Sequence, residues 1–215
     1  VMSKLSESVV EKPLLCNAEM VRAILDGIKT NTRRPMDPQP DGKLEVLEGC
    51  DDFMLGGTHG KKRSVWRCPF GKKGDRLWVR ECFAVVPHVT DNGPKHKLKG
   101  DGTGVTWRAD WNGNPSGFKW RPSIHMPRWA SRINLEITDV RVERVQEISE
   151  EDAIAEGTDF GVDAFGKRFV PPIDKTGLST HKPCRESFKA LWESIYGKSS
   201  WRLNPWVWVV AFKRV

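Results

Sequence analysis

"SRINLEITDVRVERVQEI", residues 131–148, is the stretch that decides the fold of this chain. In its first half, Ile133, Leu135 and Ile137 alternate with polar residues, which is the period of a strand with one buried face. Valines continue the alternation beyond Asp139 after a change of phase, and such a change is typical of a β-bulge. The stretch therefore predicts one long strand with a bend in it.

Shorter strand patterns lie on both sides of this stretch. A Gly-Asp turn opens an alternating segment over residues 74–83. The last segment, residues 204–215, reads NPWVWVVAFKRV, and its nearly unbroken hydrophobicity predicts a strand that is buried on both faces. The remaining strand patterns cover residues 13–16, 64–68 and 104–111, with a further possible strand over residues 43–48.

Three segments have helical spacing, and two of them carry clear terminal signals. Residues 17–27 begin at Asn17, a residue type that caps helices, and end at a glycine. Residues 149–156 begin with a capping-box pattern at Ser149. Residues 184–197 place their apolar side chains on one face, as a helix packed against a core does.

The order of these elements bounds the fold class. About six strands and three helices do not alternate regularly, which disfavours a doubly wound parallel sheet. We expect an α+β fold, a small mixed β-barrel with flanking helices, in one domain over residues 13–215. Residues 1–12 are expected to form an N-terminal tail, and loop insertions are expected at residues 35–62, 87–104 and 158–182.

The composition is basic, which indicates either a nucleic-acid or nucleotide partner or good solubility alone. The 215 residues include 35 Lys and Arg against 28 Asp and Glu, a formal net charge of +7. Ten tryptophans against one tyrosine indicate either core filling or stacking on bases. Five cysteines form no C-x-x-C pair and no metal-ligand spacing with the histidines, so we expect neither zinc nor another cofactor. No apolar run approaches the ~20 residues of a membrane span and no secretory signal is visible, so we expect a cytoplasmic protein.

The chain directly after the first predicted helix is rich in reactive and cationic side chains, namely Lys29, Thr32, Arg33 and Arg34. Burial or neighbouring positive charge favours the neutral form of a lysine amine, which can then act as a base. The Thr32 hydroxyl lies within reach of Lys29 if the chain turns between them, and threonine beside a basic amine is a known nucleophile pairing. The alternative is a basic surface loop.

The pattern G-x-K-x-x-T-x-R at residues 27–34, after an amphipathic helix, resembles the signature of ASCH domains. Gly-Asp at residues 74–75 resembles a second marker of that family, and ISEEDAIAEG and NPWVWVVAFKRV resemble its short helix and closing strand. GDRLWVRE and WRPSIHMPRWASRI resemble a phage and prophage branch. The resemblance extends from about residue 13 to the end of the chain. It implies a relative of the PUA fold, a compact β-barrel associated with RNA.

The same resemblance implies an activity. Some bacterial ASCH proteins are amidohydrolases that remove the acetyl group from the exocyclic amine of acetylcytidine, and the matching residues here are Lys29, Thr32 and Glu156. In the implied reaction, Lys29 takes the proton of Thr32, and Thr32 attacks the acyl carbonyl. Glu156 steers Lys29 or protonates the departing amine. The nearby alternatives to Glu156 are Glu147, Glu150 and Glu151.

Guanidiniums contact phosphate and indoles stack on bases. A further set of residues, rich in arginine and tryptophan, is therefore a candidate for ligand binding. The alternatives are a strand-end ion pair for Arg80 and Glu81, a core position for Trp78, and a structural hydrogen bond for His125. Function therefore stays open between a hydrolase, a non-catalytic binding module for RNA or a modified nucleotide, and a nuclease. The candidate binding residues are Arg33, Arg34, Trp78, Arg80, Glu81, His125, Arg128 and Trp129.

Overall fold

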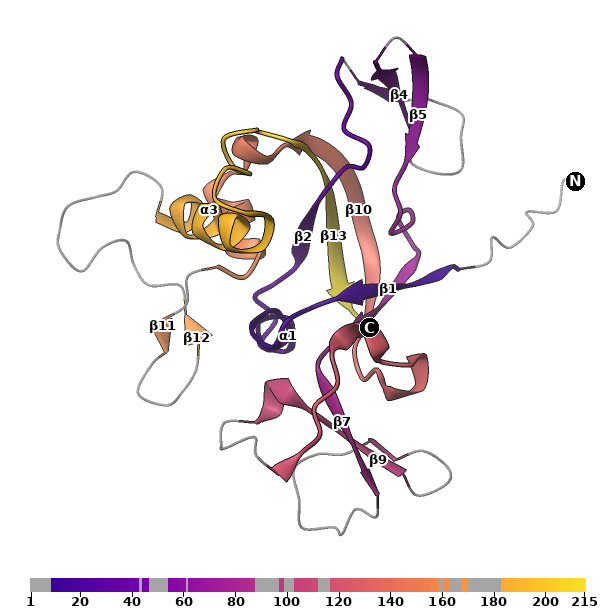
Figure 1. The fold of residues 1–215 in the computed structure, drawn as a ribbon, viewed down its shortest axis with the longest axis vertical. Coiled ribbons are helices and arrows are strands. Elements are labelled where there is room, and N and C mark those ends of the chain that lie inside the picture. The colour runs from indigo at the N-terminus through magenta and orange to yellow at the C-terminus, as the bar shows by residue number, and fades with distance from the viewer. Residues whose placement is uncertain are drawn as a thin grey trace, which may run out of the picture.

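The fold is that of a computed structural model of the chain (Figure 1). The structure describes residues 9–42, 44–46, 54–60, 62–87, 97–98, 103–111, 117–158, 161–162, 168–169 and 183–215.

One five-stranded sheet forms the centre of the molecule, with the strand order β1-β6-β10-β13-β2. Its longest ladder is antiparallel and joins β10 to β13, the two strands that the hydrophobic pattern marks most clearly. The predicted bulge is confirmed, since the register of this ladder shifts between Ile137 and Asp139. The strands of this sheet are β1 (Glu11–Leu15), β2 (Asn31–Pro35), β6 (Arg76–Arg80), β10 (Asn134–Arg144) and β13 (Trp206–Arg214).

Smaller sheets extend from the ends of the central one. A three-stranded sheet has the order β3-β4-β5, a second has the order β7-β9-β8, and β11 pairs with β12 in a short ribbon. The bounds are β3 (Glu45–Val46), β4 (Met54–His59), β5 (Lys62–Arg67), β7 (Phe83–Pro87), β8 (Lys97–Leu98), β9 (Thr103–Trp107), β11 (Gly161–Val162) and β12 (Arg168–Phe169).

Some predicted boundaries need correction. The segment 35–62, expected to be a loop insertion with one possible strand over residues 43–48, contributes β3 within that stretch and also β4, because pairing in a hairpin overrides its glycine-rich composition. The single strand expected over residues 74–83 is two strands, and the tail expected over residues 1–12 runs into β1. Most of the expected loops 87–104 and 158–182 lies outside the described residues.

Three α-helices lie within the described residues, and their caps follow the sequence signals. The Asn17 side chain accepts a hydrogen bond from the Met20 backbone N–H at the start of α1, and Ser149 does the same for Asp152 at the start of α2. Both helices end at a glycine with positive φ, as a left-handed C-terminal residue requires. The helices are α1 (Ala18–Leu25), α2 (Glu150–Ala155) and α3 (Pro183–Tyr196), and the 3₁₀ turns are Arg108–Asp110, Ser123–His125, Arg128–Ala130 and Val145–Glu147.

The central sheet buries both of its faces, as the uninterrupted apolar sequence of β13 predicts. Trp208, Val210 and Phe212 belong to a cluster that also contains residues of α1. Val207 and Val209, which alternate with them, pack instead with α3. No helix in the described part of the chain is long and apolar enough to cross a membrane.

The two edge strands of the sheet, β1 and β2, are connected by α1, and β1 crosses the sheet near one end of β2 (Figure 1). Among the described residues no backbone ladder joins these edges, so a closed barrel is not observed. One side chain does connect them, since Arg34 Nη2 on β2 donates to the Leu15 carbonyl of β1 at 2.9 Å. The α+β class is thus confirmed, and the sheet is open in its hydrogen bonding.

Candidate functional site

The segment between α1 and β2 is held tightly against two helices. After the glycine that ends α1, the backbone N–H groups of Ile28 and Lys29 both donate to the Ala23 carbonyl, at 2.9 and 3.0 Å. The Thr30 N–H donates to the Ala155 carbonyl of α2 at 2.8 Å. These bonds turn the chain before β2 begins, and they direct the Lys29 side chain toward the end of α2.

Lys29 and Glu156 form a buried ion pair. The Lys29 ammonium donates to Glu156 Oε2 at 2.7 Å, to the Glu156 carbonyl at 2.8 Å and to the Asn31 carbonyl at 2.8 Å. Lys29 is 2% exposed and Glu156 is 4% exposed. Three acceptors match the three N–H groups of an ammonium, so the charged form of Lys29 is fully satisfied in this arrangement.

The other glutamates near Glu156 have separate tasks. Glu147 accepts from the Arg144 backbone N–H, and Glu150 accepts from two N–H groups at the start of α3. Glu151 is exposed. Of the four candidates, only Glu156 contacts Lys29.

Arg33 extends this pair into a buried charge cluster of Lys29, Arg33, Glu143, Asp152 and Glu156. Its guanidinium contacts Glu143 at 2.6 Å, Asp152 at 2.6 Å and Glu156 at 3.2 Å, while its own side chain has no exposed surface. Burial acts to lower the pKa of Arg33, but the carboxylates outweigh it and raise the value. Arg33 was predicted to contact a ligand, and the structure gives it the structural task of neutralising these carboxylates.

Asp152 completes the cluster from α2. Its carboxylate binds both Arg33 and Arg141, and it also accepts from the Asn31 side chain at 3.2 Å. Burial acts to raise the pKa of Asp152, but the two guanidiniums outweigh it and hold the pKa below its usual range. The sequence pattern identifies Asp152 only as part of a helix cap, so this role was missed.

Thr32 lies between Asn31 and Arg33 on β2, and its side chain therefore points to the opposite face of the sheet from theirs. It pairs with Val210, on the face that packs against α1, and it is 1% exposed. Cys16 belongs to the same apolar cluster as Val210. Burial raises the pKa of the Cys16 thiol to about 11, and the charges of Arg34, Lys29 and Glu156 also act on it. Glu156 instead contacts Arg33, whose side chain lies on the opposite face of β2 from that of Thr32, and among the described residues no hydrogen bond joins Thr32 to Lys29 or Glu156.

A second group of predicted residues lies on the outer face of β6. Two guanidiniums lie over the Trp78 ring, that of Arg80 at 5.4 Å and that of Arg128 at 5.7 Å from its centroid. Arg80 donates to the Ile124 carbonyl, and Arg128 forms an ion pair with Glu11 at 3.0 Å. We call Trp78, Arg80 and Arg128 the Arg-Trp-Arg stack. All three residues are half-buried, so the stack keeps some exposed surface.

The remaining candidate binding residues, Glu81, His125 and Trp129, do not form one site together with this stack. Glu81 is buried and paired with Arg132 at 2.9 Å, and burial raises its pKa against the opposing effect of that guanidinium. Glu81 thus forms an ion pair, as the alternative interpretation expected, but its partner is Arg132 and not Arg80. His125 is exposed on a 3₁₀ turn, while Trp129 packs against the small cluster around Phe83.

Comparisons of this chain with models of protein families, with curated proteins and with solved structures found no match. Within the described residues, no three His, Cys, Asp or Glu side chains are grouped as metal ligands would be.

Proposed function

We propose that the chain is an ASCH-like amidohydrolase that removes an acyl group from the exocyclic amine of cytidine or a related nucleoside. The observation that carries the proposal is the direct, buried contact between Lys29 and Glu156, two residues that lie 127 positions apart. A PUA-like barrel is the fold that we propose with it. The Arg34 bridge between the edges of the central sheet supports that fold, since it connects the strands that a barrel would pair.

In the proposed reaction, the Thr32 hydroxyl oxygen adds to the acyl carbonyl carbon, and its proton passes to a neutral Lys29 amine. The carbon–nitrogen bond then breaks, and the exocyclic amine leaves with a proton from Lys29 or Glu156. Water hydrolyses the Thr32 ester, which releases the carboxylic acid and regenerates the hydroxyl.

The geometry sets two requirements for this chemistry. All three donors of the Lys29 ammonium are used, so Lys29 must release a hydrogen bond and a proton before it can act as a base. Thr32, Lys29 and Glu156 are each at most 4% exposed, so the site must open for a substrate to reach them. We infer that substrate binding supplies both changes, as in enzymes whose sites assemble on closure.

The proposal is tested by incubating the protein with acetylcytidine and following the release of cytidine by chromatography. We expect turnover in the wild type and a loss of at least about a hundredfold in Lys29→Ala and in Thr32→Val, because general-base and nucleophilic steps contribute on that scale. Lys213→Ala, at an exposed lysine of β13, is the control. Equal turnover in Thr32→Val and wild type, with both proteins folded, would rule out Thr32 as the nucleophile.

The second candidate function is a binding module for RNA or a modified nucleotide, and the Arg-Trp-Arg stack favours it. An indole with two cations beside it, on a protein with net charge +7, is suited to a base and its phosphates. A titration with short single-stranded RNA over a salt series separates the two functions. Tight, steeply salt-dependent binding without turnover supports the module, whereas turnover with weak RNA binding supports the hydrolase.

A further inference from the structure

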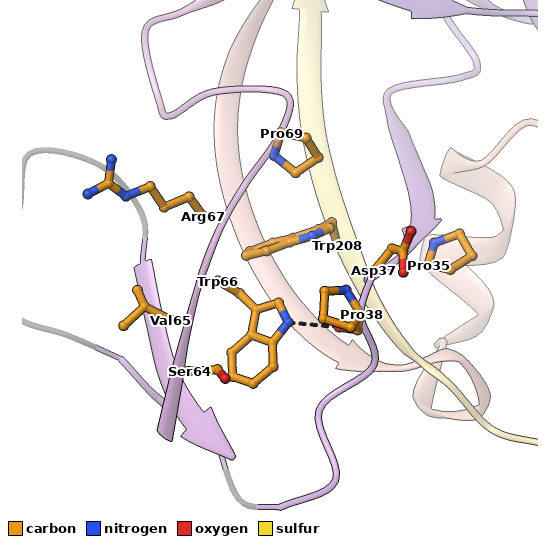
Figure 2. Close-up of a pocket in the computed structure, with 9 residues that line it drawn as sticks. All are labelled: Pro35, Asp37, Pro38, Ser64, Val65, Trp66, Arg67, Pro69 and Trp208. Carbon is orange, nitrogen blue, oxygen red and sulfur yellow. Dashed lines mark hydrogen bonds between the residues drawn. The ribbon is translucent and has the colours of Figure 1, made fainter. Parts of the chain in front are cut away.

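A pocket of about 570 Å³ lies where the end of β2, the strand β5 and the strand β13 meet. This size is within the range of small-molecule sites. The lining residues are Pro35, Asp37, Pro38, Ser64, Val65, Trp66, Arg67, Pro69 and Trp208 (Figure 2).

Proline and indole rings form part of the pocket lining, together with polar side chains. Figure 2 shows the Trp208 ring between Pro69 and Trp66, with Pro38 beside the Trp66 ring. Both indoles are largely embedded in the core, with exposed fractions of 5% for Trp66 and 2% for Trp208. The Trp66 N–H is already used, since it donates to the Pro38 carbonyl at 2.7 Å. Rings held in this way lose little freedom when a planar ligand binds against them.

The pocket presents one charged acceptor that has no partner in the described part of the chain. The Asp37 carboxylate lies at the pocket and is exposed, and no hydrogen bond or ion pair is made to it by the described residues. The Ser64 hydroxyl lies in the opposite wall, on β5. A ligand that fits must therefore bring hydrogen-bond donors to a carboxylate.

The strand beside the pocket is strongly basic. Lys62, Arg63 and Arg67 of β5 are all exposed, and Arg67 points to the other side of the strand from Trp66 (Figure 2). Of these three, Arg67 lines the pocket, and positive charge at a pocket favours a ligand that carries phosphate. The combination is therefore a pocket lined partly by proline and indole rings, with one exposed carboxylate and exposed cations of β5 beside it.

We propose that this pocket binds the base of a guanine nucleotide. Guanine presents two adjacent donors, N1–H and the N2 amino group, which match the two oxygens of the Asp37 carboxylate, while the other common bases offer one donor group at that edge. The purine ring lies against the proline and indole rings, and the phosphate extends toward the lining residue Arg67 at the edge of the pocket. This site is separate from the Lys29–Glu156 pair and does not depend on the proposed hydrolysis.

The test is isothermal titration calorimetry of the full chain with the 5′-monophosphates of guanosine, adenosine, cytidine and uridine. Guanosine monophosphate is expected to bind about tenfold or more tightly than the other three, as a bidentate contact discriminates on that scale. Asp37→Asn is expected to remove that preference, since an amide offers only one acceptor oxygen. Ser64→Phe, which places a ring inside the pocket, is expected to abolish binding.

The matched control is Glu193→Gln on α3, which removes a carboxylate far from the pocket and is expected to leave the affinities unchanged. Thermal unfolding establishes that each variant is folded. The proposal is overturned by equal binding of the four nucleotides, by a guanosine preference that survives Asp37→Asn, or by no binding at millimolar nucleotide. It is also overturned if a proline-rich peptide binds instead and is blocked by Ser64→Phe.

Discussion

The charge cluster around Arg33 and the Arg-Trp-Arg stack use the same residue type in opposite ways. Arg33 has no exposed surface and contacts three carboxylates, so its charge is neutralised inside the protein. Arg80 and Arg128 lie over an indole ring, and the side chain of Arg128 is 41% exposed. The first arrangement fixes the position of Glu156 beside Lys29, whereas the second leaves cationic surface for a ligand.

The difference teaches how a net charge should be interpreted. A buried guanidinium costs several kcal/mol to desolvate unless carboxylates surround it, so its presence in a strand predicts partners in the chain itself. An exposed guanidinium on an indole loses little by staying available. The value of +7 therefore says less about partners than the places where those charges lie.

The largest effect is expected from removing the cation at the centre of the buried cluster. Arg33→Met leaves Glu143, Asp152 and Glu156 without their shared partner, and breaking a buried ion pair costs about 3–5 kcal/mol. Urea unfolding at pH 7 measures this loss. The double change Arg33→Met with Glu143→Gln should recover part of it, and a single variant as stable as the wild type would show that the cluster does not stabilise the fold.

A smaller loss of stability is expected from Glu156→Gln, together with a complete loss of any hydrolase activity. The amide keeps the shape and one acceptor for Lys29, so about 2 kcal/mol is expected rather than the full cost of an unpaired charge. Calorimetric unfolding and the acetylcytidine assay are measured on the same sample. Glu151→Gln, at an exposed position of α2, is the control and should change neither quantity.

The next effect is a change in acid sensitivity at Asp152. Its pKa is lowered in the folded protein, because Arg33 and Arg141 outweigh the effect of burial. A carboxyl with a lowered pKa stabilises the fold above its unfolded pKa, near about 3.9, and that contribution is lost as the pH falls through the folded value. Asp152→Asn should be about 1–2 kcal/mol less stable at pH 7, and the difference should shrink toward pH 3.

Urea unfolding over a pH series checks this expectation. Asp139→Asn on β10 is the control, because its side chain is 61% exposed and its nearest cation is 4.0 Å away. A difference between Asp152→Asn and wild type that stays constant from pH 7 to about pH 3 would contradict the linkage argument.

The parts of the fold that the sequence predicts well are those set by local chemistry. The bulge near Asp139, the caps at Asn17 and Ser149, and the buried strand β13 all follow from period and residue type. The strand β4 was missed, because its stability comes from pairing with β5 rather than from propensity, whereas β3 lies within the possible strand predicted over residues 43–48.

The candidate site divides in the same way. The chemistry of Lys29 and Thr32 can be inferred from residue type and spacing, but Glu156 was identified only through the resemblance to ASCH domains. No local pattern could assign Asp152 to Arg33, because their contact depends on how α2 packs beside β2. Sequence reasoning identifies groups that can react or bind, and the fold decides which of them are already engaged with each other.

The smallest effect on stability is expected in the partly exposed Arg-Trp-Arg stack. It contrasts most sharply with the effect expected at Arg33. Arg128→Ala removes a partly exposed ion pair and one cation from the Trp78 ring, and such contacts contribute at most about 1 kcal/mol. If the stack binds RNA, the same variant should weaken binding and reduce the slope of affinity against salt by about one counterion. Arg22→Ala, at a half-buried arginine of α1, is the control in that titration. An Arg128→Ala variant that unfolds as easily as Arg33→Met would contradict this distinction between the two regions. It would show that the stack stabilises the fold and is not simply available to bind a ligand.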